Sequence, residues 1–147
     1  MRVPMDDNES RATRASFVGR FVASLAQDCM ISIVDDDASV REATQALVRS
    51  LGHPAATFSS AEEFLESDRI DDTSCLITDV QMSGMDGIEL QGRLNATGRH
   101  CPVIVVTASP DAGLRARALA AGAVGVLGKP FSDEMLIACL DGALAAR

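Results

Sequence analysis

Carboxylates, one hydroxyl and one ammonium follow short apolar runs in this chain of 147 residues. In chain order they belong to Asp35, Asp36, Asp37, Asp79, Thr107 and Lys129. If the runs lie side by side, each uncompensated pair of carboxylates about 4 Å apart costs roughly 4 kcal/mol at an effective dielectric near 20. A hard divalent cation relieves this repulsion, and oxygen ligands without a nearby His or Cys favour Mg²⁺ over zinc. The acidic residues therefore predict a magnesium site.

Thr107 and Lys129 extend this chemistry to a phosphate. A hydroxyl and an ammonium opposite the metal would bind the remaining oxygens of a phosphoryl group. Lys129 is the only lysine among 13 basic residues, which indicates a need for a compact charge that a forked guanidinium does not replace. The residue types thus indicate a Mg²⁺-assisted phosphoryl site in which one carboxylate is a candidate nucleophile.

These side chains converge only if the apolar runs are neighbouring strands. Five short runs, often β-branched, alternate with stretches of helical periodicity. The predicted strands are Met30–Val34, Ala55–Phe58, Cys75–Thr78, Pro102–Val106 and Val124–Leu127. Such alternation is typical of βαβ units, and ligands of these sheets bind beyond the carboxyl ends of the strands. We therefore predict one α/β domain, a doubly wound parallel sheet with five helices.

Helices are predicted after each strand from apolar spacing and from capping residues. Their predicted extents are 40–51, 61–65, 88–94, 110–121 and 132–146. Ser60 to Glu63 resembles a capping box, and Ser109-Pro110 is interpreted as a cap followed by the first helical residue. Asp37 is interpreted as a helix cap or a solvated acid, and Asp86 as a turn former.

Composition excludes several classes of protein. With 13 Lys and Arg against 21 Asp and Glu, the net charge of −8 argues against direct nucleic-acid binding. The sequence has no apolar stretch of about 18 residues, so no membrane-spanning helix is predicted. The four cysteines include no C-x-x-C pair and are interpreted as reduced, buried thiols of a cytoplasmic protein, in preference to zinc ligands or disulfides.

Residues 1–28 differ from the rest and are predicted to be an N-terminal extension before a domain at 29–147. The extension carries four Arg and four acidic residues, so the net charge lies in the domain. Its apolar residues between Phe17 and Ala26 have the spacing of a short amphipathic helix. A docking arm, a disordered tail and upstream sequence outside the natural product all fit, and we favour an extension without function.

Four segments together resemble the response-regulator receiver domain of the CheY-like superfamily, FixJ type. They are ISIVDDD at 31–37, CLITDVQMSGMDGIEL at 75–90, VIVVTA at 103–108 and AGAVGVLGKPF at 121–131. The resemblance covers residues 30–146, and the spacings agree: 44 residues from Asp35 to Asp79, 28 from Asp79 to Thr107 and 50 from Asp79 to Lys129. It implies a flavodoxin-like, CheY-like fold with strand order 2-1-3-4-5.

The resemblance also implies roles for individual residues. Asp79 would accept a phosphoryl group from a phosphohistidine. Asp36 and Asp79 would bind Mg²⁺ directly, Asp35 mostly through a water, and the backbone carbonyl of Gln81 would complete the protein ligands. Thr107 would close on the phosphoryl group.

Lys129 would pair with the phosphoryl charge, and the Lys129-Pro130 peptide is usually cis in this family. By the same resemblance, the protein serves two-component or phosphorelay signalling. A sensor histidine kinase or a histidine phosphotransfer protein is the expected donor, and a downstream protein is the expected target. The chain would not be an enzyme beyond slow self-dephosphorylation. Phosphorylation would favour a homodimer through the helix after Thr107, the fifth strand and the last helix.

Three departures from the family affect the output of the switch. Val126 stands where receivers usually carry the Tyr or Phe that reports phosphorylation, so output would run through the 107–112 loop or through a partner that binds the acidic surface. Ser83 replaces a usual proline, which predicts a less rigid 80–87 loop. Gly125 and Gly128 replace bulkier or acidic residues and leave the fifth strand open to a partner.

The sequence suggests two alternatives to the phospho-accepting switch. Val126 motivates a receiver-fold interaction module that does not signal by phosphorylation, although the intact acidic set argues against it. An aspartyl phosphatase would need an acid-base carboxylate two residues after Asp79, where Gln81 stands. We also expect a stand-alone receiver, in preference to one that lacks its output domain.

Overall fold

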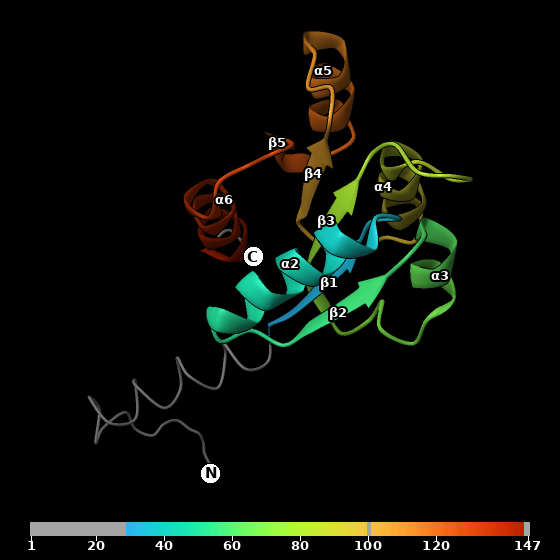
Figure 1. Ribbon diagram of the computed structural model, residues 1–147. Helices are drawn as coiled ribbons and strands as arrows, with labels where there is room; N and C mark the ends of the chain where they lie inside the picture. Colours follow the sequence, from blue (N-terminus) through green and yellow to red (C-terminus); the bar gives the residue numbers. More distant parts are fainter. Residues whose placement is uncertain (1–28, 100, 146–147) are drawn as a thin grey trace.

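Five strands and five helices alternate along the part of the chain that the computed structural model describes, residues 29–99 and 101–145 (Figure 1). The strands are β1 (Met30–Val34), β2 (Ala55–Phe58), β3 (Thr73–Asp79), β4 (Val103–Thr107) and β5 (Ala123–Gly128). The helices are α2 (Ala38–Ser50), α3 (Ala61–Glu66), α4 (Gly87–Ala96), α5 (Ala112–Ala120) and α6 (Asp133–Ala145). The extension predicted at residues 1–28 lies outside the described residues.

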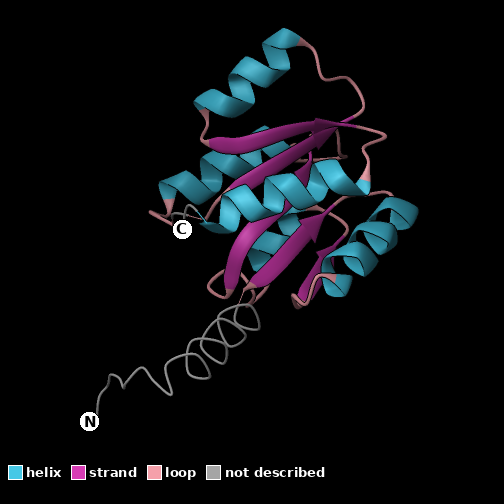
Figure 2. Cartoon of the chain, turned by 90° about the vertical axis from the view of Figure 1, so that its left-hand side faces the viewer, coloured by secondary structure: helices cyan, strands magenta, loops and turns pink. Residues whose placement is uncertain are grey.

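The strands form one parallel sheet in the order β2-β1-β3-β4-β5, which confirms the predicted fold class. Helices cover both faces of this sheet (Figure 2). One face packs against apolar residues of α3, α4 and α5, and the other against those of α2 and α6. The central strands are buried on both faces because helices lie on each side, which explains their continuous apolar runs.

The third strand begins earlier than its apolar run predicts. β3 starts at Thr73, which pairs with Met30 of β1, and the polar Thr73 and Ser74 are buried in the sheet. The hydroxyls of Thr73 and Ser32 form a hydrogen bond of 2.7 Å, which compensates for the burial of both groups. A polar residue with a partner across the sheet therefore belongs to the strand.

Asp37 and Asp86 each cap the start of a helix. The carboxylate of Asp37 accepts hydrogen bonds from Ser39 N at 2.9 Å and Val40 N at 3.2 Å, which confirms its interpretation as a cap. Asp86, predicted as a turn former, is the N-cap of α4 and forms a full capping box with Glu89.

Two predicted helix caps are wrong in part. The helix after β4 is capped by Asp111, whose carboxylate accepts from Leu114 N at 2.8 Å, and not by Ser109. Residues 109–111 form a tight turn, in which the Ser109 carbonyl accepts from Asp111 N at 2.8 Å, and the helix begins only after this turn. Ser60 caps α3 as expected, but the Glu63 carboxylate bonds to the neighbouring residue Ser59 and not to Ser60.

Buried and exposed positions agree with a folded α/β core. Cys29 and Cys75 are buried, as predicted, whereas Cys101 and Cys139 are only half-buried. Among the described residues, no helix is both long and apolar enough to cross a membrane.

Candidate functional site

The carboxyl ends of β1, β3, β4 and β5 meet at one edge of the sheet. The register aligns Val34 of β1 with Thr78 of β3, and Thr107 of β4 with Gly128 of β5. Each predicted residue is at the end of its strand or just beyond it, so the parallel arrangement brings these side chains to the same edge. The convergence expected from the sequence is therefore present in the fold.

Three of the four aspartates gather there. The side chains of Asp35, Asp36 and Asp79 each offer a carboxylate oxygen, and these oxygens lie within 4.8 Å of one another. Asp35 and Asp79 are only 3% and 5% exposed, whereas Asp36 is exposed. Asp37 is not in this group, because its carboxylate caps α2. Three oxygen donors with one open side suit Mg²⁺, which binds through carboxylates and keeps several waters.

Asp35 is held in place by contacts on every polar group. Its Oδ1 accepts a hydrogen bond from Asp37 N at 2.9 Å, and its Oδ2 accepts one from Lys129 Nζ at 2.9 Å. Its backbone carbonyl accepts from Arg41 Nη1 at 2.8 Å, and its amide donates to Phe58 O at 3.1 Å. The carboxylate is thus oriented before any ligand arrives.

Lys129 bridges the two buried carboxylates. Its Nζ lies 2.9 Å from Asp35 Oδ2 and 3.4 Å from Asp79 Oδ2. Burial by itself would lower the pKa of Lys129, but the hydrogen bond and charge of Asp35, and then those of Asp79, raise it above its ordinary value. The lysine is therefore protonated at neutral pH. As the resemblance implies, the Lys129-Pro130 peptide is cis.

Asp79 carries an uncompensated part of the negative charge. Burial raises the pKa of its carboxyl group, and the nearby charge of Asp35 raises it further, while Lys129 opposes both effects. The Lys129 ammonium forms ion pairs with two of the three clustered carboxylates, those of Asp35 and Asp79. A divalent cation fits this imbalance, because it would supply the positive charge that Lys129 alone does not.

Thr107 is fully buried and contacts the loop after β3 instead of the carboxylates. Its hydroxyl donates to the Gln81 side-chain carbonyl Oε1 at 3.2 Å and accepts from Ser109 N at 3.0 Å. The resemblance drew attention to the backbone carbonyl of Gln81, and the role of its side chain was missed. In the sequence, the only indication that the Gln81 side chain lies near the site is its position two residues after Asp79.

Gly87 lets α4 begin directly behind Asp79. A Cβ atom on Gly87 would lie 2.3 Å from the carbonyl oxygen of Asp79, so a larger residue cannot occupy this position without a backbone shift. The Gly87 amide donates to Val80 O at 3.0 Å and closes the loop between them. The loop that carries Gln81 is therefore closed just beyond the end of β3, by a hydrogen bond between Val80 and Gly87.

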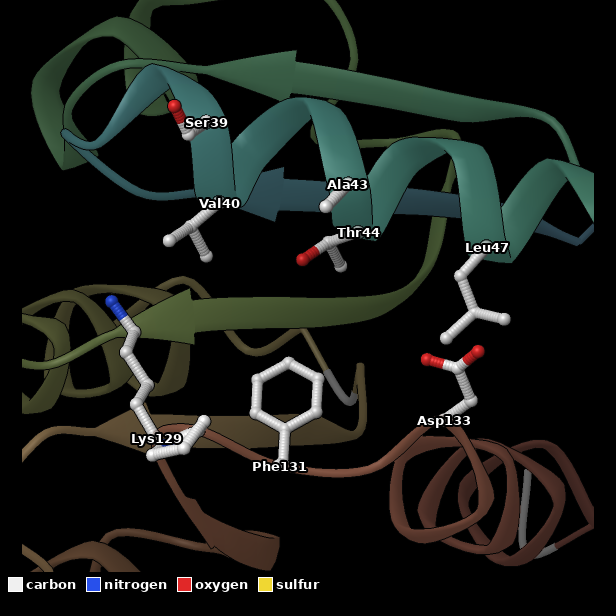
Figure 3. Close-up of a pocket in the computed structure, with 9 residues that line it drawn as sticks. Ser39, Val40, Ala43, Thr44, Leu47, Lys129, Phe131 and Asp133 are labelled. Carbon is white, nitrogen blue, oxygen red and sulfur yellow. The ribbon is translucent and has the colours of Figure 1, made fainter.

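A groove of about 450 Å³ opens beside the acidic cluster, between α2 and the segment from β5 to α6. Figure 3 shows Lys129 and Asp133 at opposite ends of its lower wall, with the Phe131 ring between them. Val40, Thr44 and Leu47 of α2 point toward this wall. Lys129 thus both lines the groove and forms an ion pair with the carboxylate of Asp35.

Comparison with known proteins places this site in a family. Residues 31–141 match the response regulator receiver domain. Nodulation protein W of Bradyrhizobium diazoefficiens is 39% identical over 117 residues, which cover 80% of this chain and 50% of that protein. The transcriptional regulatory protein FixJ of Azorhizobium caulinodans is 40% identical, over 78% of this chain and 54% of that protein. The chain spans about half the length of the curated relatives it matches.

Solved structures agree with the sequence matches. The crystal structure of FixJ-N has a TM-score of 0.74 and 32% identity, and the match covers 82% of this chain and 97% of that one. The response regulator StyR has a TM-score of 0.74 and 40% identity, over 80% of this chain and 59% of that one. Together with the arrangement of acids, threonine and lysine, these matches show that the chain belongs to the response regulator receiver domain family, the phospho-accepting regulators of two-component signalling.

Proposed function

We propose that this chain accepts a phosphoryl group on Asp79 from the phosphohistidine of a sensor histidine kinase or a histidine phosphotransfer protein. The observation that carries the proposal is the buried Asp79 carboxylate, which lies 3.4 Å from the Lys129 ammonium in a cluster of three acids. Asp35, Asp36, Asp79 and the backbone carbonyl of Gln81 would hold Mg²⁺.

The transfer is a displacement at phosphorus. An Asp79 carboxylate oxygen attacks the phosphorus atom, the new P–O bond forms as the P–N bond breaks, and the imidazole leaves with the electron pair. Mg²⁺, when bound, neutralises charge on the carboxylates and on the phosphoryl oxygens. Lys129 binds a phosphoryl oxygen, and its raised pKa keeps it charged for this role. The product is a regulator that loses its acyl phosphate slowly, and not a turnover enzyme.

Thr107 links the phosphoryl group to the output. To reach a phosphoryl oxygen, its hydroxyl must leave Gln81 Oε1 and Ser109 N, to which it is bonded without a phosphate. The Ser109 amide then loses its acceptor, and the loop from Ala108 to Asp111 is free to move. Val126 is buried in the apolar core under α5 and has no ring to swing, so we assign the output to this loop.

Gly128 sets how this loop rests on the sheet. A Cβ atom on Gly128 would lie 2.8 Å from Cγ of Pro110, so the proline ring occupies the space that a side chain would fill. A shift of Ser109 therefore also lifts Pro110 from β5 and changes the start of α5. The small residue and the proline together take the place of an aromatic reporter.

The face of α5, β5 and α6 is the proposed surface for partners. It exposes Leu119, Val124 and Met135 by 45%, 49% and 48%. A phosphorylation-dependent homodimer or a downstream protein target would cover these side chains. We further propose that the receiver domain is residues 29–147, that it acts in the cytoplasm, and that this chain does not itself contact DNA.

The intact mass of the protein after incubation with acetyl phosphate, with and without Mg²⁺, tests the proposal. We expect one phosphoryl adduct that requires Mg²⁺ and is absent in Asp79→Asn. Asp37→Asn is the matched control and should label normally, because Asn also caps a helix and residue 37 is outside the cluster.

The same labelled sample should sediment as a dimer if the partner surface is correct. An unlabelled but folded wild-type protein would contradict phosphoacceptance and revive the interaction module. An adduct with an unchanged sedimentation profile would contradict only the homodimer.

A further inference from the structure

Glu62 connects two elements that are distant in sequence. It lies in the first turn of α3, and its Oε2 accepts a hydrogen bond of 3.0 Å from the amide of Met85, 23 residues away. Met85 belongs to the loop that runs from Asp79 to α4. Neighbouring Glu63 makes no such contact, because its carboxylate bonds to Ser59 at the start of its own helix.

The loop is shaped to receive this carboxylate. Gly84 has φ of +78°, a backbone conformation that favours glycine. A Cβ atom on Gly84 would lie 2.7 Å from Glu62 Oε2, so the space for the carboxylate exists only because a side chain is absent. The Met85 amide is the main cause that lowers the pKa of Glu62, with a smaller contribution from Arg93 of α4, so the acceptor is ionised at neutral pH.

The middle of the loop after β3, residues 81–85, has few restraints of its own. The ends of the loop are held by the Gly87 to Val80 hydrogen bond and by the Asp86 cap of α4. Between them, residues 81–85 contain no proline and include a glycine with positive φ, so local geometry alone restrains them weakly. The charged hydrogen bond from Glu62 supplies a restraint from outside the loop.

We propose that Glu62 is a positioning residue for the phosphoryl site, which holds the loop after β3 so that Gln81 presents its backbone carbonyl to Mg²⁺ and its side chain to Thr107. The inference rests on the proposed function for its metal and phosphoryl partners. The contact itself is independent of that function, because it joins α3 and the loop without any ligand. Glu62 lies outside the cluster of carboxylates and acts on the site only through the loop.

The test compares Glu62→Ala and Glu62→Gln with Glu63→Ala as the matched control on the same turn. Hydrogen exchange of the Met85 amide and titration with MgCl₂ are followed by NMR on ¹⁵N-labelled protein, and acetyl phosphate labelling by intact mass. In Glu62→Ala we expect faster Met85 exchange and Mg²⁺ binding weakened by about threefold to tenfold. Labelling should slow by the same factor at low Mg²⁺ and recover at saturating Mg²⁺.

Glu62→Gln keeps an acceptor oxygen and should fall between Glu62→Ala and wild type, whereas Glu63→Ala should leave both site readouts unchanged. Faster Met85 exchange with unchanged Mg²⁺ affinity would overturn the proposal, because the contact would then serve the loop alone. Unchanged exchange would overturn the contact. If wild type neither binds Mg²⁺ nor labels, the proposed function fails, while Met85 exchange still reports on the contact.

Discussion

The two halves of the functional edge are held together by different forces. At the ends of β1 and β3, directional polar contacts dominate. The carboxylate of Asp35 accepts hydrogen bonds from Lys129 Nζ and Asp37 N, and its backbone carbonyl accepts one from Arg41. On the β5 side, the fit depends on side chains that are absent. Gly128 leaves room for the ring of Pro110, and Gly125 leaves room for the thiol of a cysteine on α6.

This difference assigns the acceptance of the phosphoryl group to the polar contacts at β1 and β3, and the transmission of the signal to the packing at β5. Charges and hydrogen bonds place atoms to within a few tenths of an ångström, which a phosphoryl acceptor requires. Apolar contacts at small residues tolerate a second arrangement, which a switch requires. Thr107 lies at the boundary, because its hydroxyl is bonded to Gln81 on one side and to Ser109 on the other.

The largest effect is expected from the loss of Lys129, whose side chain reaches from the end of β5 to the carboxylates of Asp35 and Asp79. In Lys129→Met, labelling by acetyl phosphate should slow by about 10²- to 10³-fold, because no ammonium would then stabilise the transferring group. Mg²⁺ should bind at least as tightly, since a competing cation is removed from Asp35 and Asp79. Labelling rates and Mg²⁺ titration on one preparation check both. Lys129→Arg, with its planar fork, should not restore the rate; a normal rate in either variant would contradict the role of the ammonium.

The negative charge of Asp79 should also lower the free energy of unfolding of the protein, compared with a neutral side chain at this position. Because burial and Asp35 raise the pKa of Asp79, the unfolded chain loses this proton at a lower pH than the folded chain. Stability therefore falls as pH rises from the ordinary value of 3.8 through the raised pKa, and stays lower above it. Asp79→Asn removes this penalty.

We expect Asp79→Asn to be more stable than wild type by about 1–2 kcal/mol at pH 7, because Lys129 already offsets part of a repulsion of roughly 4 kcal/mol. The gain should vanish below the ordinary pKa. Urea unfolding measures this gain in stability. It is followed by circular dichroism, because the chain has no Trp or Tyr whose fluorescence could report unfolding. Added Mg²⁺ should narrow the difference by stabilising wild type. Equal stability at every pH would show that the acids are fully compensated.

The smallest effect on labelling is expected on the β5 side, where Gly128 and Gly125 pack against Pro110 and Cys139. Gly128→Ala should cost about 1–3 kcal/mol, because the new Cβ would meet the rigid ring of Pro110 at 2.8 Å. Gly125→Ala is the matched control on the same strand and should cost less than about 1 kcal/mol, because the Cys139 thiol at 3.0 Å can turn away. Both variants should still label with Mg²⁺. Equal costs would mean that Pro110 does not rest on β5 as tightly as described.

Much of the fold and of the acidic site follows from local pattern. β-branched runs predicted all five strands to within two residues, and the site residues followed because parallel strands end at one edge. For Asp37, a short acidic side chain before an apolar helical pattern predicts a helix cap or a solvated acid, and the structure shows the cap. The roles of individual residues in phosphoryl transfer came from the family resemblance and remain proposals.

Contacts between distant residues could not be predicted in this way. Sequence pattern placed the cap of α5 at Ser109, whereas a tight turn moves it to Asp111. The bonds of Glu62 to Met85 and of Thr107 to Gln81 join residues 23 and 26 positions apart. Neither pair has a spacing that a helix or a strand would impose, so no local rule indicates them.

The amino-acid sequence by itself determined the alternation of strands and helices, and with it which acids, hydroxyl and lysine share one edge, because these depend on short-range periodicity and on the geometry of parallel sheets. Only the tertiary structure decided how the carboxylates share Lys129, which loop Glu62 holds, and that Pro110 rests on Gly128. The physical reason is the distance along the chain over which each effect acts. Backbone preference acts over a few residues, whereas hydrogen bonds and packing act between whatever atoms the completed fold brings within a few ångströms.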